Sequence, residues 1–457
     1  MHALSTSPAP SSRPRFVPRL ASLALTAVVL LTGLPAWSLD LQQAYESAQA
    51  HDATARAAAA AADAARERLP QARAQLLPNI AFSAGRNRND LSREQSGVPI
   101  PEAPYYSFNQ TLQLRQPIYR RPLMLALEQA DHLVADADAT LERERQNLGV
   151  RVTGAYLEAL LAQDQLDLVL RQHAFTLAYL DAARKALAAG SGTRTEIDEA
   201  QARLDLNLAQ QLEARQQLDY TRRQLESMTG QPAGELVPVD PQRLTLVAPQ
   251  PAALEDWLLL AESGSPELLA LKSRLEAARL EVGKAQGAHH PTLDALLQVT
   301  RSASENVTTP ESSYLNRTVG LQLNLPLYAG GYASSVVRQA AAESLRAEET
   351  LEATRRDLGL RMQREFRGVT EGVLKVRALE QAVRSAEQLV KSSRRSFEAG
   401  SRSLLDVLNA EQQQQTALRD LAQARYLYLL SHVRLQALAG TDQAAAISQV
   451  NGWLVRP

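Results

Sequence analysis

The sequence predicts a mainly helical protein with a small β part, in which one helix–β-hairpin–long helix unit occurs twice. The first observation is a set of matched segments, such as Pro117-Ile118-Tyr119 and Pro326-Leu327-Tyr328, which lie 209 residues apart. The second is a pair of long stretches without proline, and the third is a pair of segments that alternate apolar and polar residues. This spacing is too long for a solenoid repeat and indicates a duplicated domain-sized unit.

The first 38 residues have the pattern of a secretory signal peptide. A basic stretch that ends at Arg19 precedes the apolar run Leu20–Leu34, and Ala36-Trp37-Ser38 supplies small residues for cleavage after Ser38. The alternative is an N-terminal membrane anchor, for which the apolar run is short. Cleavage would leave 46 basic and 50 acidic residues, without the basic excess that is typical of a nucleic-acid partner.

Proline placement divides the rest of the chain. Five prolines crowd the stretch 231–253, whereas none occurs between Pro122 and Pro232 or between Pro326 and Pro457. Proline inside a helix costs about 3 kcal/mol, so the two gaps permit very long helices. We therefore predict a first repeat, a proline-rich linker, a second repeat and a short C-terminal tail, at 39–230, 231–253, 254–440 and 441–457.

A glycine-rich turn interrupts each proline-free gap, at Ala189–Gly192 and at Ala399–Ser401. At about 1.5 Å per residue, a helix that fills the first part of a gap is about 100 Å long. Two shorter helices laid end to end would match this length, with Pro70 and Gly283 as equivalent candidate kinks in the opening helices. The expected helices are 40–77, 123–188 and 194–229 in the first repeat, and 254–289, 332–398 and 403–439 in the second.

The segments between the opening helix and the long helix have a period of two. In 105–115 and in 315–325 apolar residues alternate with polar ones, and the partner segments 79–89 and 292–302 show the pattern less cleanly. The β-hairpins are expected at about 79–118 and at about 292–327. Their strands are about 10 residues long, which is enough to cross a membrane when tilted.

Two structures fit these strands. One is a soluble sheet with a buried face, and the other is a transmembrane barrel with its apolar face toward lipid and its polar face toward a lumen. The barrel is favoured because a soluble sheet needs a covering layer and the helices are occupied with one another. Four strands cannot close a membrane barrel, so other copies must complete it. Two copies would give eight strands, whereas three would give twelve and leave a passage.

On particular motifs the chain resembles the TolC-like outer-membrane channel proteins, and especially their protein-secretion branch. The resemblance covers roughly 39–440. The residues that carry it are Leu77-Pro78 and its counterpart Pro291, the strand exits Arg115–Tyr119 and Leu325–Gly331, and the turn segments Ala189–Gln201 and Phe397–Glu411.

The resemblance implies a homotrimer with a twelve-stranded β-barrel in the outer membrane and an α-helical barrel through the periplasm. It implies an exit duct for type I protein secretion or multidrug efflux that docks with a periplasmic adaptor protein. An inner-membrane transporter of the ABC or proton-driven type and outer-membrane lipid complete the expected partners. The turns expected to contact the adaptor carry Gly190, Gly192, Gly400 and Ser401.

The family closes its tunnel at the periplasmic tip, and the resemblance places this gate on five residues. They are Thr195 and Glu196 in the first repeat and Arg402, Asp406 and Asn409 in the second. An arginine can bridge to a carboxylate or hydroxyl on a neighbouring helix, which would hold helix pairs together. From the residues alone, the alternative is ordinary helix-start chemistry, with Thr195 and Ser403 as caps and with Glu196 and Asp406 favoured by the helix dipole.

The chain departs from the family pattern at two gate positions. Asn409 stands where some members have a second Asp ring, and Phe397 stands where they have a Tyr. Threefold repetition of Asp406 would still make one acidic ring. We therefore expect weaker cation binding at the tip than in a two-ring member.

An enzyme is not predicted, and neither a cofactor nor a metal is expected. The sequence contains no cysteine, phosphate loop, nucleophile elbow or zinc-binding spacing. The pair His289-His290 precedes Pro291 and fits a helix end. The remaining alternative is a periplasmic coiled-coil adaptor or scaffold of an export complex, which would leave the two-faced strands and the duplication unexplained.

Overall fold

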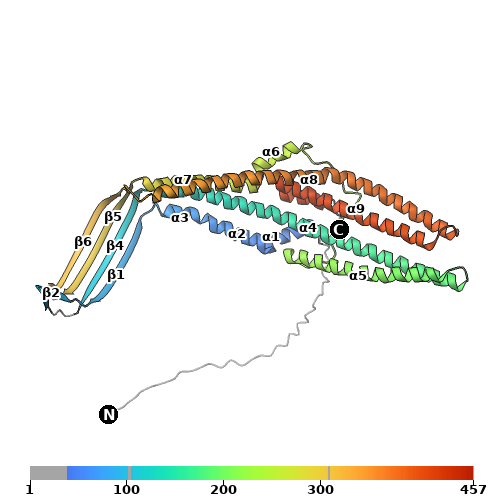
Figure 1. Cartoon of the computed structure of the whole chain (residues 1–457), viewed down its shortest axis with the longest axis horizontal. Coiled ribbons are helices and arrows are strands. Elements are labelled where there is room, and N and C mark those ends of the chain that lie inside the picture. Colours follow the sequence, from blue (N-terminus) through green and yellow to red (C-terminus); the bar gives the residue numbers. More distant parts are fainter. Residues whose placement is uncertain (1–38, 101–103, 307–308, 456–457) are drawn as a thin grey trace, which may run out of the picture. The chain divides into compact units, whose positions relative to one another are not determined.

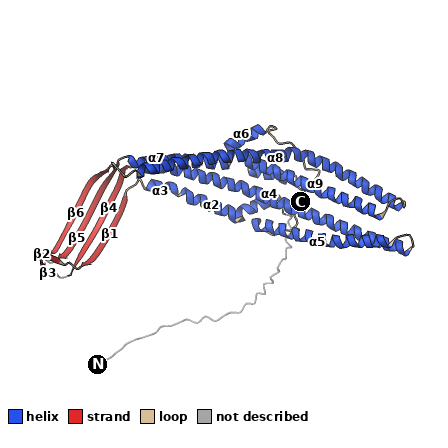
Figure 2. Ribbon diagram, in the orientation of Figure 1, coloured by secondary structure: helices blue, strands red, loops and turns tan. Residues whose placement is uncertain are grey.

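The computed structural model describes residues 39–100, 104–306 and 309–455. The signal peptide expected at 1–38 lies outside these residues. The described chain combines long helices with a four-stranded antiparallel sheet (Figures 1 and 2), as the sequence predicts. The first repeat contains α1 Leu41–His51, α2 Ala53–Arg66, α3 Arg68–Ala74, β1 Asn79–Asn89, β2 Arg93–Gln95, β3 Val98–Ile100, β4 Tyr105–Tyr119, α4 Arg121–Ala188 and α5 Arg194–Thr229. The second contains α6 Leu254–Gly264, α7 Pro266–Gln286, a short 3₁₀ helix Gly287–His289, β5 Thr292–Asn306, β6 Thr309–Asn324, α8 Tyr332–Glu398 and α9 Leu404–Ala439, and α10 Gln443–Asn451 follows in the tail.

The long helices end close to where proline and glycine predict. Helices α5 and α9 both end at a glycine in the left-handed conformation, Gly230 and Gly440. At Gly440 the close approach of another backbone adds a second requirement, since a Cβ there would lie 2.0 Å from the Gly264 carbonyl oxygen. Glycine therefore serves both to stop α9 and to let α6 pass beside it.

The opening helices are more broken than the sequence predicts. The helix expected at 40–77 is interrupted at Asp52 and Glu67, and the one expected at 254–289 is interrupted at Ser265. Asp52 and Ser265 are equivalent positions of the two repeats, and both leave the helical conformation. The candidate kink at Gly283 lies inside α7, which continues through it, because the break falls instead at the residue before Pro266.

Long helices pack side by side as the length argument predicts. Helix α4 contacts α5 along one part and α1, α2 and α3 along the other, while α8 packs on α9 and α7 (Figure 1). Helix α7 also packs on α4 and so joins the two repeats. None of the helices in the described residues has the length and apolar character that crossing a membrane requires.

The main core lies where the linker and the tail meet the helices. The α4 side chain Tyr156 is fully buried and donates its hydroxyl to the carbonyl oxygens of Leu39 and Val237, both at 2.9 Å. The tail, for which no role is predicted from the sequence, contains α10 and Trp453, and the Trp453 indole nitrogen donates to the Thr245 hydroxyl at 3.1 Å. The tail thus fixes the linker against the helices.

The strand order of the sheet is β1-β4-β5-β6, with every neighbouring pair antiparallel. Facing residues of antiparallel strands lie on one side, so the register defines two faces. The apolar face carries Ile80, Phe82, Leu112, Leu114, Leu297, Val299, Val319 and Leu321. The polar face carries Ser83, Asn87, Asn109, Thr111, Gln113, Gln298, Thr300, Asn316 and Thr318.

The apolar face of this sheet is open in the single chain. Ile80 and Phe82 are 67% and 66% exposed, and Val319 and Leu321 are 79% and 70% exposed. Strands β1 and β6 each pair on one side within the described residues, which leaves an open edge at both ends of the sheet. The single chain therefore neither covers the apolar face nor pairs the backbone hydrogen-bonding groups at the two edges of the sheet.

Candidate functional site

The expected gate residues lie at the end of the helices remote from the sheet, where α4 turns into α5 and α8 into α9 (Figure 1). Each turn contains a glycine in the left-handed region, Gly190 at φ +77° and Gly400 at φ +75°. The serine that follows returns its backbone N–H to the preceding helix: Ser191 donates to Ala186 at 2.9 Å, and Ser401 to Ser396 at 2.8 Å. Both turns are thus tight and locally hydrogen-bonded.

Both turns end in a capping box. Thr193 caps α5: its backbone N–H donates to the Glu196 carboxylate at 2.9 Å, and its hydroxyl accepts from the Glu196 N–H at 3.3 Å. In α9, the Ser403 N–H donates to Asp406 at 3.0 Å, and its hydroxyl accepts from the Asp406 N–H at 3.2 Å. The carboxylates of Glu196 and Asp406 therefore stabilise helix starts, and Ser403 is a cap as expected. The expected cap Thr195 is wrong, because Thr193 caps α5 and Thr195 lies inside its first turn.

Arg402 does not form an ion pair with Asp406 in the described chain, although its charge acts on it. Its guanidinium donates instead to the hydroxyl of Ser393 on α8 at 3.0 Å, and Ser393 is fully buried. Hydrogen bonds from Ser403, aided by the charge of Arg402, hold the pKa of Asp406 below its usual range. Asp406 is therefore charged at neutral pH, and Arg402 is bonded to the helix that leads into its own turn.

Asn409 joins the two helix pairs. Its side-chain oxygen accepts from Nη2 of Arg203 at 2.8 Å, which links α9 of the second repeat to α5 of the first. A second link lies nearby, since the Gln172 amide on α4 donates to Gln412 on α9 at 2.9 Å. Sequence reasoning missed both Arg203 and Gln172, because each link depends on which helix faces are adjacent.

A half-buried ion pair and an aromatic cluster form a further contact near the tip. Arg394 on α8 donates Nε to the Glu411 carboxylate on α9 at 3.0 Å, and Nη2 binds the same oxygen. The guanidinium lies over the ring of Phe175 on α4, 4.7 Å from its centre. The rings of Phe175 and Tyr179 are 4.4 Å apart, and Phe397 lies 6.4 Å from Tyr179. Phe397 thus packs in this cluster, which connects α4 to the α8–α9 pair.

At the opposite end, a charge cluster ties the strands to the helices. Asp294 at the start of β5 is almost fully buried and binds two arginines. Nη2 of Arg115 on β4 lies 2.6 Å from Asp294 Oδ2, and Nη2 of Arg120, just before α4, lies 2.5 Å from the same oxygen. One carboxylate of the second repeat therefore binds the end of β4 and the start of α4 in the first repeat.

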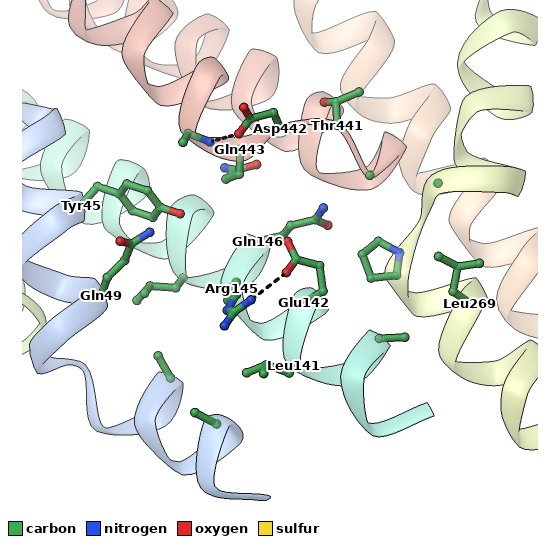
Figure 3. Close-up of a pocket in the computed structure, with 18 of the residues that line it drawn as sticks. Tyr45, Gln49, Leu141, Glu142, Arg145, Gln146, Leu269, Thr441, Asp442 and Gln443 are labelled. Atoms are coloured by element: carbon green, nitrogen blue, oxygen red, sulfur yellow. Dashed lines mark hydrogen bonds and ion pairs between the residues drawn. The ribbon is translucent and has the colours of Figure 1, made fainter. Parts of the chain in front are cut away.

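A hollow of about 670 Å³ lies away from both the turns and the sheet (Figure 3). It is bordered by the helix breaks and by the α9–α10 turn, and an ion pair between Arg145 and Glu142 at 3.3 Å lines it. Neither histidine nor cysteine occurs among its lining residues. Across the described residues, no group of three or more His, Cys, Asp or Glu side chains could hold a metal ion.

Comparison with known proteins decides the family. The model of the outer membrane efflux protein family matches residues 44–231 and 257–441, which is most of the chain and both repeats. The chain belongs to the outer membrane efflux protein family. It is therefore an outer-membrane channel protein that extends into the periplasm, and not an enzyme or a periplasmic adaptor.

The relatives of this family member include secretion proteins. It is 32% identical to the proteases secretion protein PrtF of Dickeya chrysanthemi, over 95% of each chain. It is also 32% identical to the alkaline protease secretion protein AprF of Pseudomonas aeruginosa, over 94% of this chain and 91% of that one. Outer membrane protein TolC of Vibrio cholerae is 28% identical, over 95% of this chain and 98% of TolC.

Solved structures agree on the fold. CusC matches with a TM-score of 0.77 at 14% identity, over 89% of this chain and 93% of CusC. The outer membrane protein VceC of Vibrio cholerae matches with a TM-score of 0.74 at 20% identity, over 88% of this chain and 96% of VceC. The predicted fold class, mainly helical with a small β part, is confirmed.

Proposed function

We propose that three copies of this channel protein assemble into the exit duct of a secretion or efflux system. Their sheets combine into a twelve-stranded barrel in the outer membrane, and their helices into a tunnel through the periplasm. One observation carries the proposal: the four-stranded sheet has two open edges and an exposed apolar face. In lipid, unpaired edges are excluded, so β1 of one copy pairs with β6 of the next. The polar face then lines a passage.

Assembly is tested on the intact protein in outer-membrane extracts. We expect a heat-sensitive oligomer of three chains on electrophoresis, and cross-linking by a bifunctional maleimide between introduced cysteines at Gly85 in β1 and Gly320 in β6. The chain has no cysteine of its own, so the cross-link would report this edge alone. A monomer that stays in the soluble fraction, or an oligomer cross-linked without β1 and β6, would refute the barrel.

The cargo is proposed to be protein that passes directly from the cytoplasm to the outside. Support comes from the two protease secretion proteins that share about a third of its residues over nearly the full chain. The duct docks with a periplasmic adaptor through the turns that carry Gly190, Gly192, Gly400 and Ser401, and with an ABC or proton-driven inner-membrane transporter. Loss of particular proteins from the medium of a deletion strain is the expected result, whereas an unchanged secretome with raised drug sensitivity would indicate efflux.

The gate is proposed to lie at the tip, at Thr195, Glu196, Arg402, Asp406 and Asn409. Two contacts there support it: Arg203 on α5 donates to Asn409 on α9 and so joins separate helices, and Arg402 in the α8–α9 turn donates to Ser393 on α8. In the assembled tunnel these helices must separate for the tip to open. We expect Arg402→Ser or Asp406→Ala to raise the single-channel conductance in planar bilayers. Wild-type conductance in both variants would count against a gate at these residues.

A further inference from the structure

The apolar runs of three strands end at an arginine, on the same face of the sheet. Counted from the helical end, β1 presents Ile80, Phe82 and Ala84 and then Arg86. Strand β5 presents Leu293, Ala295, Leu297 and Val299 and then Arg301, and β6 presents Leu323, Leu321 and Val319 and then Arg317. In all three strands this arginine is the first charged residue of the apolar face. On β4, the run of Leu114 and Leu112 ends at Gln110.

These arginines follow one line across the sheet. Arg86 on β1 pairs with Phe108 on β4, which pairs with Ala303 on β5. Arg301 lies two residues nearer the helices than Ala303 on the same strand. Arg301 faces Leu315, so Arg317 is again two residues nearer on β6. From β1 to β6 the arginine position thus shifts by four residues along the strands, at about 3.3 Å per residue, while the sheet is crossed by three strand spacings of about 4.8 Å. The line through the arginines is therefore inclined by about 43° to the hydrogen-bond direction.

This inclination matches the tilt of strands in a membrane barrel, about 35–45°. Because the strands of such a barrel are tilted, residues at one height in the membrane are shifted along each strand relative to the next by this angle. The starts of the apolar runs shift in the same direction. The β1 run begins at Ile80, which is aligned across the sheet with Val319 on β6, whereas the β6 run begins at Leu323, four residues nearer the helices. The three arginines therefore stand at one level, where the continuous apolar runs of β1, β5 and β6 end. Beyond this level the described part of the same face carries only separate apolar or aromatic residues, such as Phe108 and Leu315.

The arginine side chains on this level are accessible. Arg86, Arg301 and Arg317 are exposed, and the guanidinium of Arg86 lies over the ring of Tyr106, 4.8 Å from its centre. Arginine next to an interfacial aromatic residue is suited to the headgroup region, where its forked donors match phosphate oxygens. Because the helices extend into the periplasm, this level lies at the outer leaflet.

We propose that Arg86, Arg301 and Arg317 form a phosphate-binding rim for the phosphorylated glycolipid of the outer leaflet. The proposal rests on the proposed barrel, in which β1 and β6 of adjacent copies meet and the rim continues around the assembly. Charge complementarity selects the occupant, since lipid phosphates at this level are anionic and arginine is always positive. The lipid would bind across strands and help to hold adjacent copies together.

The test compares lipids that differ in phosphate alone. Intact oligomer stripped of lipid is titrated with bisphosphorylated lipid A, dephosphorylated lipid A or a zwitterionic phospholipid, and the temperature at which the oligomer dissociates is recorded. We expect bisphosphorylated lipid A to stabilise the wild type, and the two other lipids to act much less. The triple variant Arg86→Gln, Arg301→Gln and Arg317→Gln should need at least about tenfold more lipid A for the same stabilisation.

Matched variants control for charge and folding. Arg338→Gln, Arg346→Gln and Arg356→Gln together remove three exposed arginines from α8 and should leave the lipid A titration unchanged. The triple Arg→Lys variant of the rim keeps the charge and should fall between the wild type and the Gln variant. If the triple Gln variant does not assemble, the single Gln variants are titrated in its place. Equal titration of wild type and rim variants, or equal action of dephosphorylated lipid A, would overturn the proposal.

A separate measurement keeps the failure of this proposal apart from failure of the barrel. In the variant Leu321→Cys, the introduced thiol lies in the apolar run of β6, and a lipid-soluble maleimide should label it in intact outer membranes. Labelling without lipid A selectivity refutes the rim and leaves the barrel standing. Absence of labelling refutes the placement of the sheet in lipid, and the rim with it.

Discussion

The ion pair between Arg394 and Glu411 offers the sharpest test of the tip structure. Glu411 is 7% exposed, and Arg394 supplies both of its described hydrogen bonds. Replacing Arg394 by Met keeps a long apolar chain against Phe175 but leaves the carboxylate without its partner. Removing one partner of a buried pair costs about 3–5 kcal/mol. The side chain of Arg394 is 47% exposed, so water screens the pair, and we expect a loss of about 2 kcal/mol.

The pH dependence of this loss identifies its cause. Burial raises the pKa of Glu411 above its usual value even though Arg394 lowers it, and loss of Arg394 would raise it further. A carboxyl whose pKa is higher in the folded state binds its proton more tightly there, so stability falls as pH rises from the unfolded toward the folded pKa and is regained on acidification. The loss of folding stability caused by Arg394→Met should therefore be large near pH 8 and smaller near pH 5.

The assay is thermal unfolding of the purified oligomer in detergent at both pH values. Arg394→Met should lower the midpoint by several degrees near pH 8 and by less near pH 5. Glu411→Gln removes the charge while keeping the shape, and in the double variant it should restore much of the loss. A deficit that is equal at both pH values, together with no rescue by Glu411→Gln, would refute a buried charge as the cause.

Three further outcomes are expected. Multivalent cations should block the conductance of this channel less strongly than that of a relative with two Asp rings, because Asp406 would form a single ring in the proposed trimer; equal block would contradict this. Arg203→Ala should raise conductance by removing the link to Asn409, while Arg223→Ala, which breaks an exposed pair within α5, should not. Trp453→Ala should destabilise the linker region by about 3 kcal/mol, because the largely buried ring and its bond to Thr245 are lost; an unchanged unfolding midpoint would exclude a stabilising tail.

Proline and glycine made the long helices predictable. The helix expected at 332–398 is α8, and the one expected at 194–229 is α5, with the same ends. The opening helices were less predictable because their apolar pattern continues through the breaks. A signal was present: Asp52 accepts from the Ala55 N–H as an N-cap and pairs with Arg151, and Ser265 precedes Pro266. Helix-start residues inside an apparent helix indicate a break only when their tertiary partners are known.

The contacts at the proposed gate were predictable from the sequence only in part, for the same reason. Turn chemistry is local, so the sequence locates Gly190, Gly400 and the cap Ser403, although the cap of α5 is Thr193 and not Thr195. The bonds from Arg203 to Asn409 and from Gln172 to Gln412 join residues 206 and 240 positions apart. No sequence period relates them, since they depend on which faces of four helices are adjacent at the tip.

The duplication shows which of the proposed gate residues differs between the two repeats. Glu196 and Asp406 are equivalent positions and make the same capping box, so the acid alone does not distinguish the repeats. Arg402 takes the place of Gly192, where a Cβ would lie 2.9 Å from the Leu187 nitrogen, and its partner Ser393 takes the place of the buried Ala183. Both changes are needed for the bond between Arg402 and Ser393.

A gate test should therefore separate the bond from the cap. Asp406→Ala removes the capping bond to Ser403 as well as a charge, so a rise in conductance could arise from a frayed helix. Arg402→Ser leaves the cap intact, and Ser393→Ala removes the acceptor of Arg402 without touching α9. If the bond closes the tip, Arg402→Ser, Ser393→Ala and the double variant raise conductance to the same extent, whereas additive effects would show that Arg402 acts through another partner.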